Sequence, residues 1–133
     1  MNKILRISLV ALLTLVSAFS FASEVTFDAT KDKFGGKDPA KITGTKDGVT
    51  FELSNGVMGN GREYRFYKGE TLTLSVASGN ITKIVFTSTI DKPTEKYGVG
   101  NFTAEAGSYS AEGNTGTWTG SANTVKLTAK SNQ

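Results

Sequence analysis

This 133-residue chain contains no histidine and no cysteine, and the absence of both side chains restricts the chemistry that it can perform. A Ser-His-Asp triad, a cysteine nucleophile and a histidine or thiolate metal site each need one of these side chains. The sequence therefore excludes most hydrolase mechanisms. We expect a protein that is not an enzyme and that needs no cofactor or metal.

Carboxylates are the remaining groups that could do chemistry. Two of them could cleave a glycosidic bond, but no pair among Asp28, Asp32, Asp38, Glu63 and Glu70 is singled out by its spacing. The three aspartates among them, Asp28, Asp32 and Asp38, flank one loop and offer oxygen ligands to Ca²⁺. Their spacing does not match the EF-hand pattern. Solvated surface carboxylates are the commoner outcome, so calcium is not part of the predicted protein.

Aromatic side chains near loops suggest a binding surface instead, since a flat ring can stack on a sugar ring while amides and charges bind its hydroxyl groups. One tyrosine shares a strand face with an arginine, another lies in a glycine-flanked loop, and two polar residues border a glycine-rich connection. The single tryptophan is centred in a short strand, where burial in the core is the alternative role. The candidate ligand-binding residues are Tyr67, Tyr97, Arg65, Arg62, Asn60 and Trp118.

Residues 62–90 are expected to organise the fold, because they hold three runs that alternate apolar and polar residues with the period of a β-strand. The runs REYRFY, TLTLSV and ITKIVFTSTI are separated by turns at Lys68-Gly69-Glu70 and Ser78-Gly79-Asn80. We predict a β-meander of three consecutive strands. Arg65, Tyr67 and Val85 should face away from the buried side. The residues predicted to be buried are Tyr64, Phe66, Leu72, Leu74, Val76, Ile84 and Phe86.

Short strands are predicted along the rest of the chain, at intervals of 8 to 12 residues and bounded by glycine and asparagine. An Asp47-Gly48 hairpin turn separates two of them. No window from residue 23 onward has the helical period, so no significant helix is expected. We predict an all-β protein of about nine short strands, folded as an antiparallel β-sandwich. A closed barrel is the alternative.

The first 22 residues are typical of a secretory signal peptide, with Lys3 and Arg6 ahead of an apolar run from residue 7 to residue 21. We expect cleavage after Ala22, which leaves residues 23–133 as a single domain. The apolar run is too short to span a bilayer, so the mature protein should have no membrane span. It should be exported; whether it is secreted, periplasmic or attached to the cell surface is left open.

The charge of residues 23–133 is close to neutral. Removing the two cations of the leader from the 15 lysines and arginines leaves 13, against 12 acidic residues, a net charge of +1. Nucleic acid is not an expected partner, because binding to phosphates needs a concentrated basic surface. Without cysteines there are no disulfides, so stability must come from packing of the core.

Several stretches resemble a β-sandwich module found in secreted and surface proteins of gut bacteria: YRFYKG, LTLS, GNITKIVFT, YGVGNF, GSYS, GTWTGSA and AKSNQ. They follow one another in a consistent order over most of residues 23–133. The resemblance implies a jelly-roll-like fold of the carbohydrate-binding or adhesion type. The family usually continues past the equivalent of residues 131–133 into one more strand, which implies a sheet edge that could pair with another chain.

We therefore expect an exported, non-catalytic binding module whose ligand is a carbohydrate. The alternative is a protein-interaction or adhesion module that acts through an open sheet edge. Exposed aromatic residues gathered on one surface would favour the glycan, whereas buried aromatic residues beside an open edge would favour a protein partner.

Overall fold

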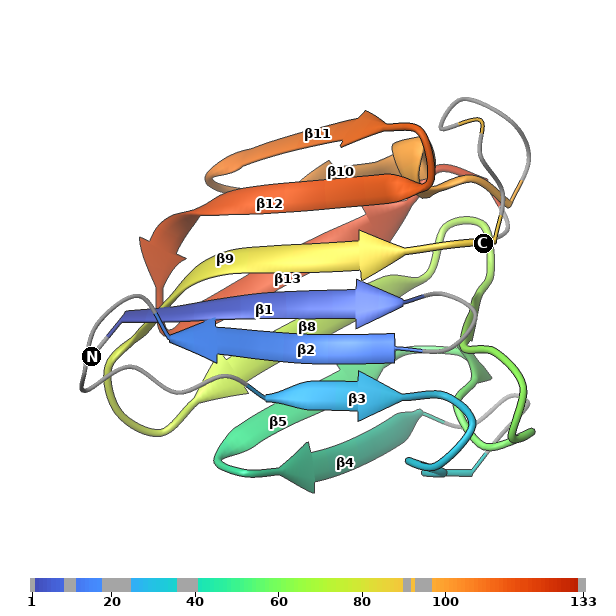
Figure 1. Ribbon diagram of the computed structural model, residues 1–133, viewed down its shortest axis with the longest axis horizontal. Coiled ribbons are helices and arrows are strands. Elements are labelled where there is room, and N and C mark those ends of the chain that lie inside the picture. The colour runs from blue at the N-terminus through green and yellow to red at the C-terminus, as the bar shows by residue number, and fades with distance from the viewer. Residues whose placement is uncertain are drawn as a thin grey trace.

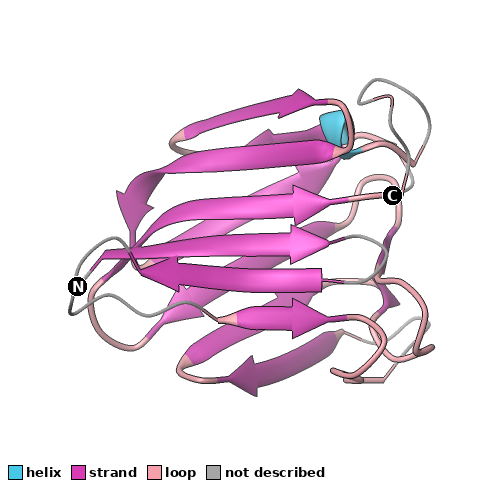
Figure 2. Ribbon diagram, in the orientation of Figure 1, coloured by secondary structure: helices cyan, strands magenta, loops and turns pink. Residues whose placement is uncertain are grey.

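The structure is a computed structural model that describes residues 2–8, 12–17, 25–35, 41–89, 92 and 97–131, with only the backbone described in the first two ranges. Two β-sheets lie face to face (Figure 1). Because they are separate sheets, the protein is a sandwich and not a closed barrel. The predicted all-β, antiparallel β-sandwich fold is confirmed; Figure 2 shows strands throughout the described residues, with one short 3-10 helix, η1 (Val99–Asn101).

The first sheet has six strands in the order β1-β3-β2-β9-β12-β11, with additional pairings of β1 with β2 and β9. Its pairs are antiparallel except those of β1 with β3 and with β9. Its strands are β1 (Asn2–Ser8), β2 (Leu12–Ser17), β3 (Thr26–Asp28), β9 (Asn80–Thr87), β11 (Ser108–Glu112) and β12 (Thr115–Ala122).

The second sheet has five antiparallel strands in the order β10-β13-β8-β5-β4, and a small third sheet pairs β6 with β7. The predicted turn at Asp47-Gly48 joins β4 to β5, and both residues have positive φ, of 48° and 83°. The strands of these sheets are β4 (Ile42–Lys46), β5 (Val49–Leu53), β6 (Gly56–Val57), β7 (Arg65–Phe66), β8 (Thr71–Val76), β10 (Phe102–Ala104) and β13 (Thr124–Ala129).

One core lies between the two large sheets, and aromatic rings from both sides meet in it. The Phe27 ring centroid lies 5.8 Å from that of Phe51, and Phe86 stacks on Phe102 at 4.9 Å. All seven residues predicted to be buried are buried, and the alternation of β8 continues to its end. Val85 faces away from this core, as predicted, but is nevertheless only 7 % exposed.

The predicted meander over residues 62–90 is wrong, because its three strands belong to three different sheets. β7 is only two residues long and pairs with β6, β8 pairs with β5 and β13, and β9 pairs with β12. The turn after Val76 thus crosses from one layer of the sandwich to the other. Alternation reveals which face of a strand is buried, but two strands that face each other across a core alternate in the same way as two neighbours in one sheet.

Of the residues predicted to form a signal peptide, 2–8 and 12–17 are described, and both segments are strands in the first sheet. β1 and β2 pair with each other in antiparallel register, from Lys3↔Ser17 to Leu5↔Leu15. Figure 1 shows this hairpin between β3 and β9. The predicted cleavage site after Ala22 lies outside the described residues.

The last strand is not a sheet edge in the part of the chain that the structure describes. β13 pairs with β10 on one side and with β8 on the other. An open edge beside the end of the chain, as the resemblance implied, is therefore not found at β13. Among the described strands the five-stranded sheet ends at β4 and β10, while β11 is an outer strand of the other sheet.

Candidate functional site

The irregular connections that carry most of the candidate residues gather at one end of the sandwich, here called the loop end. It consists of residues 29–35, 54–70 and 97–101 (right-hand side of Figure 1). Backbone hydrogen bonds join the first two, since the amide of Phe34 donates to the carbonyl oxygen of Met58 at 2.8 Å and the amide of Met58 to that of Gly35 at 3.0 Å. These bonds hold the glycine-rich connection in one arrangement.

Tyr67 and Tyr97 belong to two neighbouring parts of the loop end. The turn after Tyr67 pairs with the end of β13, where the amide of Gly69 donates to the carbonyl oxygen of Ala129 at 2.8 Å. The next residue, Lys130, donates its amide to the carbonyl oxygen of Asn101 at 2.6 Å. The two segments that carry the candidate tyrosines are about 30 residues apart in the sequence, and they flank the end of β13 on its two sides.

Tyr97 is the exposed large apolar side chain among the described residues, with 48 % of its surface accessible. Its backbone adopts φ = 71°, in the left-handed region that bulky residues rarely occupy. Such backbone strain concentrates at functional sites, where the surrounding structure holds it in place. Tyr67 is only partly exposed and follows Phe66, whose ring packs against Phe102 at 5.6 Å.

Asn60, Arg62 and Arg65 form a second, self-contained group at the loop end. The Asn60 side-chain oxygen accepts hydrogen bonds from the amides of Arg62 at 2.8 Å and Glu63 at 3.0 Å. Arg65 is paired with the Glu63 carboxylate, with Nε and Oε1 2.6 Å apart. Asn60 thus stabilises the turn, and Arg65 remains exposed but has its charge balanced by Glu63.

Trp118 lies in the core, away from the candidate tyrosines. Its side chain is only 1 % exposed, and its indole N–H donates to the carbonyl oxygen of Ala106 at 2.7 Å. A buried ring whose polar group is already bonded has no face to offer a ligand. Trp118 is therefore a core residue, which was the alternative to a ligand-binding role.

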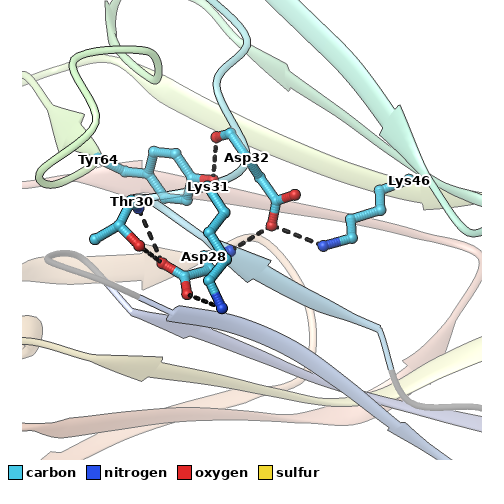
Figure 3. A network of polar contacts seen from close by, with 6 residues as sticks. All are labelled: Asp28, Thr30, Lys31, Asp32, Lys46 and Tyr64. Carbon is cyan, nitrogen blue, oxygen red and sulfur yellow. Dashed lines mark hydrogen bonds and ion pairs between the residues drawn. The ribbon is translucent and has the colours of Figure 1, made fainter.

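A network of polar contacts at the end of β3 involves two of the aspartates considered as calcium ligands (Figure 3). The Asp28 carboxylate accepts hydrogen bonds from the hydroxyl of Thr30 at 2.6 Å and from its amide at 2.9 Å, and it lies 3.8 Å from the Lys31 ammonium. The Thr30 hydroxyl is the main reason why the pKa of Asp28 is lowered; burial opposes the shift, and the Lys31 and Lys46 charges assist it.

Asp32 connects this network to two other parts of the fold. Its carboxylate accepts from the Asp28 amide at 2.6 Å and from the Lys46 ammonium at 2.7 Å. Its backbone carbonyl oxygen accepts from the Tyr64 hydroxyl at 2.7 Å. Both carboxylates are thus matched by lysines, and the network ties the end of β3 to β4 and to the segment before β7. Asp38, the third aspartate, lies outside the described residues.

Two buried tyrosines should make the protein sensitive to alkaline pH. Burial raises the pKa of Tyr64, assisted by the negative charges of Asp32 and Asp28, and burial alone raises the pKa of Tyr109. An unfolded tyrosine ionises near pH 10, whereas these two keep their protons to higher pH in the folded protein. Their contribution to stability is therefore complete below pH 10 and declines above it, by about 1.4 kcal/mol per pH unit for each tyrosine.

Urea unfolding of the wild type, Tyr64→Phe and Tyr109→Phe at pH 10, 11 and 12 measures this effect. The free energy of unfolding of the wild type should fall more steeply with pH than that of either variant, by about 1.4 kcal/mol per pH unit, because each variant lacks one ionisable group. Measurements from pH 7 to 9 are the control, since these tyrosines are protonated there in both states. Equal slopes for all three proteins above pH 10 would contradict the assignment.

Sequence reasoning missed the groups that hold the loop end in place. The Asn101 side-chain amide donates to the carbonyl oxygen of Gly98 at 3.1 Å and so supports the segment after Tyr97. In the sequence, Glu63 is one of several scattered carboxylates that could act in glycoside cleavage. Its position three residues after Asn60 is a signal for a local turn that could have been recognised.

Within the described residues, no group of three or more acidic side chains is close enough together to hold a metal ion, and no helix is long and apolar enough to cross a membrane. What the loop end offers chemically is an exposed aromatic ring, a second, partly exposed tyrosine across the end of β13, and a charge pair between Arg65 and Glu63. Comparison of the chain with protein-family models, with curated proteins and with solved structures found no match to any of them.

Proposed function

We propose that this protein is an exported, non-catalytic module that binds carbohydrate at the loop end, with Tyr97 as the main contact and Tyr67 as the second. The observation that carries the proposal is the exposure of Tyr97 on a strained backbone, across the end of β13 from the segment that bears Tyr67. A large aromatic ring held at the surface gains little for the fold. It is suited to stacking on the apolar face of a sugar ring.

The polar surroundings of the two tyrosines are also suited to a sugar. The hydroxyl groups of both tyrosines and the exposed side chain of Lys68 can form hydrogen bonds with sugar hydroxyls. Arg62 is exposed at the same end of the sandwich, and Arg65 and Glu63 form a charge pair there. An exposed aromatic ring surrounded by hydroxyl, ammonium and guanidinium donors is suited to a ligand that combines an apolar face with many hydroxyl groups.

The sequence supports the exported location and the class of protein. The leader at residues 1–22 has the charge and apolar pattern of a secretory signal, and the resemblance to modules from secreted proteins of gut bacteria implies carbohydrate binding or adhesion. The missing histidines and cysteines support a role without catalysis.

A glycan array probed with the exported protein tests the proposal, and titration of the strongest ligand then locates the site. Tyr97→Ala should weaken binding about tenfold, equivalent to about 1.4 kcal/mol, because the stacking surface is lost. Tyr97→Phe should bind nearly as well as the wild type, since it keeps the ring.

The matched control is Thr124→Ala, which changes an exposed residue at the start of β13, whereas the loop end adjoins the end of that strand. It should bind like the wild type. All three variants should keep the melting temperature of the wild type within a few degrees, so that a loss of binding reports on the site. The proposal fails if no glycan binds, or if Tyr97→Ala and Thr124→Ala bind equally well.

A further inference from the structure

The β1–β2 hairpin fills a place in the first sheet between β3 and β9. β1 runs parallel to β9 over its whole length, from Asn2↔Asn80 to Ser8↔Thr87. β1 also pairs with β3, at Arg6↔Thr26 and Ile7↔Phe27. β2 pairs with β9 at two positions and with β3 at Leu12↔Asp28, so each strand of the hairpin contacts both flanking strands. On its other side β9 is paired with β12. Among the described residues, β9 and β3 are therefore linked through the hairpin and not paired directly with each other.

The same residues have the sequence of a removable leader. Cleavage after Ala22 would take away β1 and β2 but leave β3, which begins at Thr26. β9 would then lose the partner along one side of seven of its eight residues. The backbone N–H and C=O groups on that side would become available for pairing, next to the buried side chains of Ile84 and Phe86.

β3 is held away from β9 by contacts that do not involve the leader. Phe27 packs against Phe51 at 5.8 Å and against Phe34 at 5.7 Å, on the side of the sandwich formed by β4 and β5. Asp32, close behind β3, is bonded to Lys46 at the end of β4. Direct pairing of β3 with β9 would require a shift of at least one strand spacing, about 4.8 Å, and would break these contacts.

We propose that the place between β3 and β9 is a strand-acceptor site, which in the exported protein binds an extended segment donated by a different polypeptide. The strand that runs parallel to β9 here, β1, indicates the chemistry of the donor: about seven extended residues with branched apolar side chains and two basic ones, at the positions of Lys3 and Arg6. Main-chain hydrogen bonds would provide affinity, and alternate apolar side chains would fit the core beside Phe86. The proposal rests on removal of the leader and is independent of the glycan site.

The test uses the protein as a bacterial host exports it, with its N-terminus determined by mass spectrometry. The probe is a fluorescent peptide with the sequence of residues 2–17, followed by three lysines for solubility. Fluorescence anisotropy should show saturable binding, and the bound peptide should raise the melting temperature. The same peptide with Leu5→Pro and Leu13→Pro should bind at least tenfold more weakly, because proline cannot donate to a β-ladder and blocks the pairing.

Disulfide trapping locates the bound peptide, since the chain has no cysteine of its own. A peptide with Ser8→Cys should crosslink to Thr87→Cys, the residue that it faces in β9, and not to Thr128→Cys in the other sheet. An exported protein that melts cooperatively only after the peptide is added would also support the proposal. It would be overturned by retention of residues 1–22 after export, by absence of binding, by equal binding of the proline peptide, or by a stable dimer that excludes the peptide.

Discussion

Replacing Trp118 with alanine is expected to lower the free energy of unfolding by about 3 to 5 kcal/mol, the range for removing a large aromatic side chain from a core. The side chain is 1 % exposed, and its indole N–H is bonded to the carbonyl oxygen of Ala106. Its ring packs so closely on two glycines that a methyl group at Gly107 or Gly120 would lie 2.6 or 2.7 Å from an indole atom. Alanine would leave a cavity and an unpaired carbonyl group.

Urea unfolding of the purified variant measures the loss of stability. A second variant, Trp118→Phe, separates the cost of the cavity from the cost of the lost hydrogen bond. Phenylalanine keeps most of the buried ring but loses the N–H, so it should cost about 1 to 2 kcal/mol, mainly for the hydrogen bond. Tyr97→Ala is the control, because it removes an exposed aromatic ring and should change stability by about 0.5 kcal/mol or less. A loss below 1 kcal/mol for Trp118→Ala would show that the tryptophan is not a core residue.

Gly116→Ala is expected to cost about 2 to 4 kcal/mol, the sum of about 1 to 3 kcal/mol for overpacking and about 1 kcal/mol for a weakened hydrogen bond. A Cβ at this position would lie 2.0 Å from the hydroxyl oxygen of Tyr109 and 3.1 Å from the Cβ of Val99. The Tyr109 hydroxyl donates to the carbonyl oxygen of Val99, which anchors η1 to β11. The methyl group would push the ring aside and break this bond.

The double variant Gly116→Ala with Tyr109→Phe tests that explanation by urea unfolding. Because the hydroxyl oxygen is the atom nearest the added methyl group, removing it should recover at least 1 kcal/mol relative to the sum of the two single changes. The double-mutant cycle is therefore expected to show favourable coupling. Strictly additive effects would mean that the two residues do not collide in this way.

The period of two in the sequence was sufficient to predict most of the strands after residue 25 and their buried faces. β8 covers residues 71–76, as the alternation of Leu72, Leu74 and Val76 predicted. Turn chemistry was equally informative, since Asp47-Gly48 forms the expected hairpin. These features are local, because they depend on residues within a few positions of one another.

The candidate site could be predicted only in part. The face shared by Tyr67 and Arg65 is less buried than that of Tyr64 and Phe66, as predicted, whereas the exposure of Tyr97 was found only in the structure. The strand position of Trp118 was compatible with either a site or a core role. The fold decided between them through glycines and a carbonyl oxygen from the neighbouring segment, none of which alternation reveals.

The sequence by itself determined the all-β class, the buried face of most strands and the chemistry that the protein lacks, because residue types and local periodicity are sufficient for these. Only the tertiary structure decided which sheet each strand joins, as the separation of β7, β8 and β9 into three sheets shows. It also decided that the segments of Tyr67 and Tyr97 flank the end of β13 and that β1 and β2 lie between β3 and β9. Pairing partners depend on contacts between residues far apart in the chain, and a repeat of two residues contains no information about them.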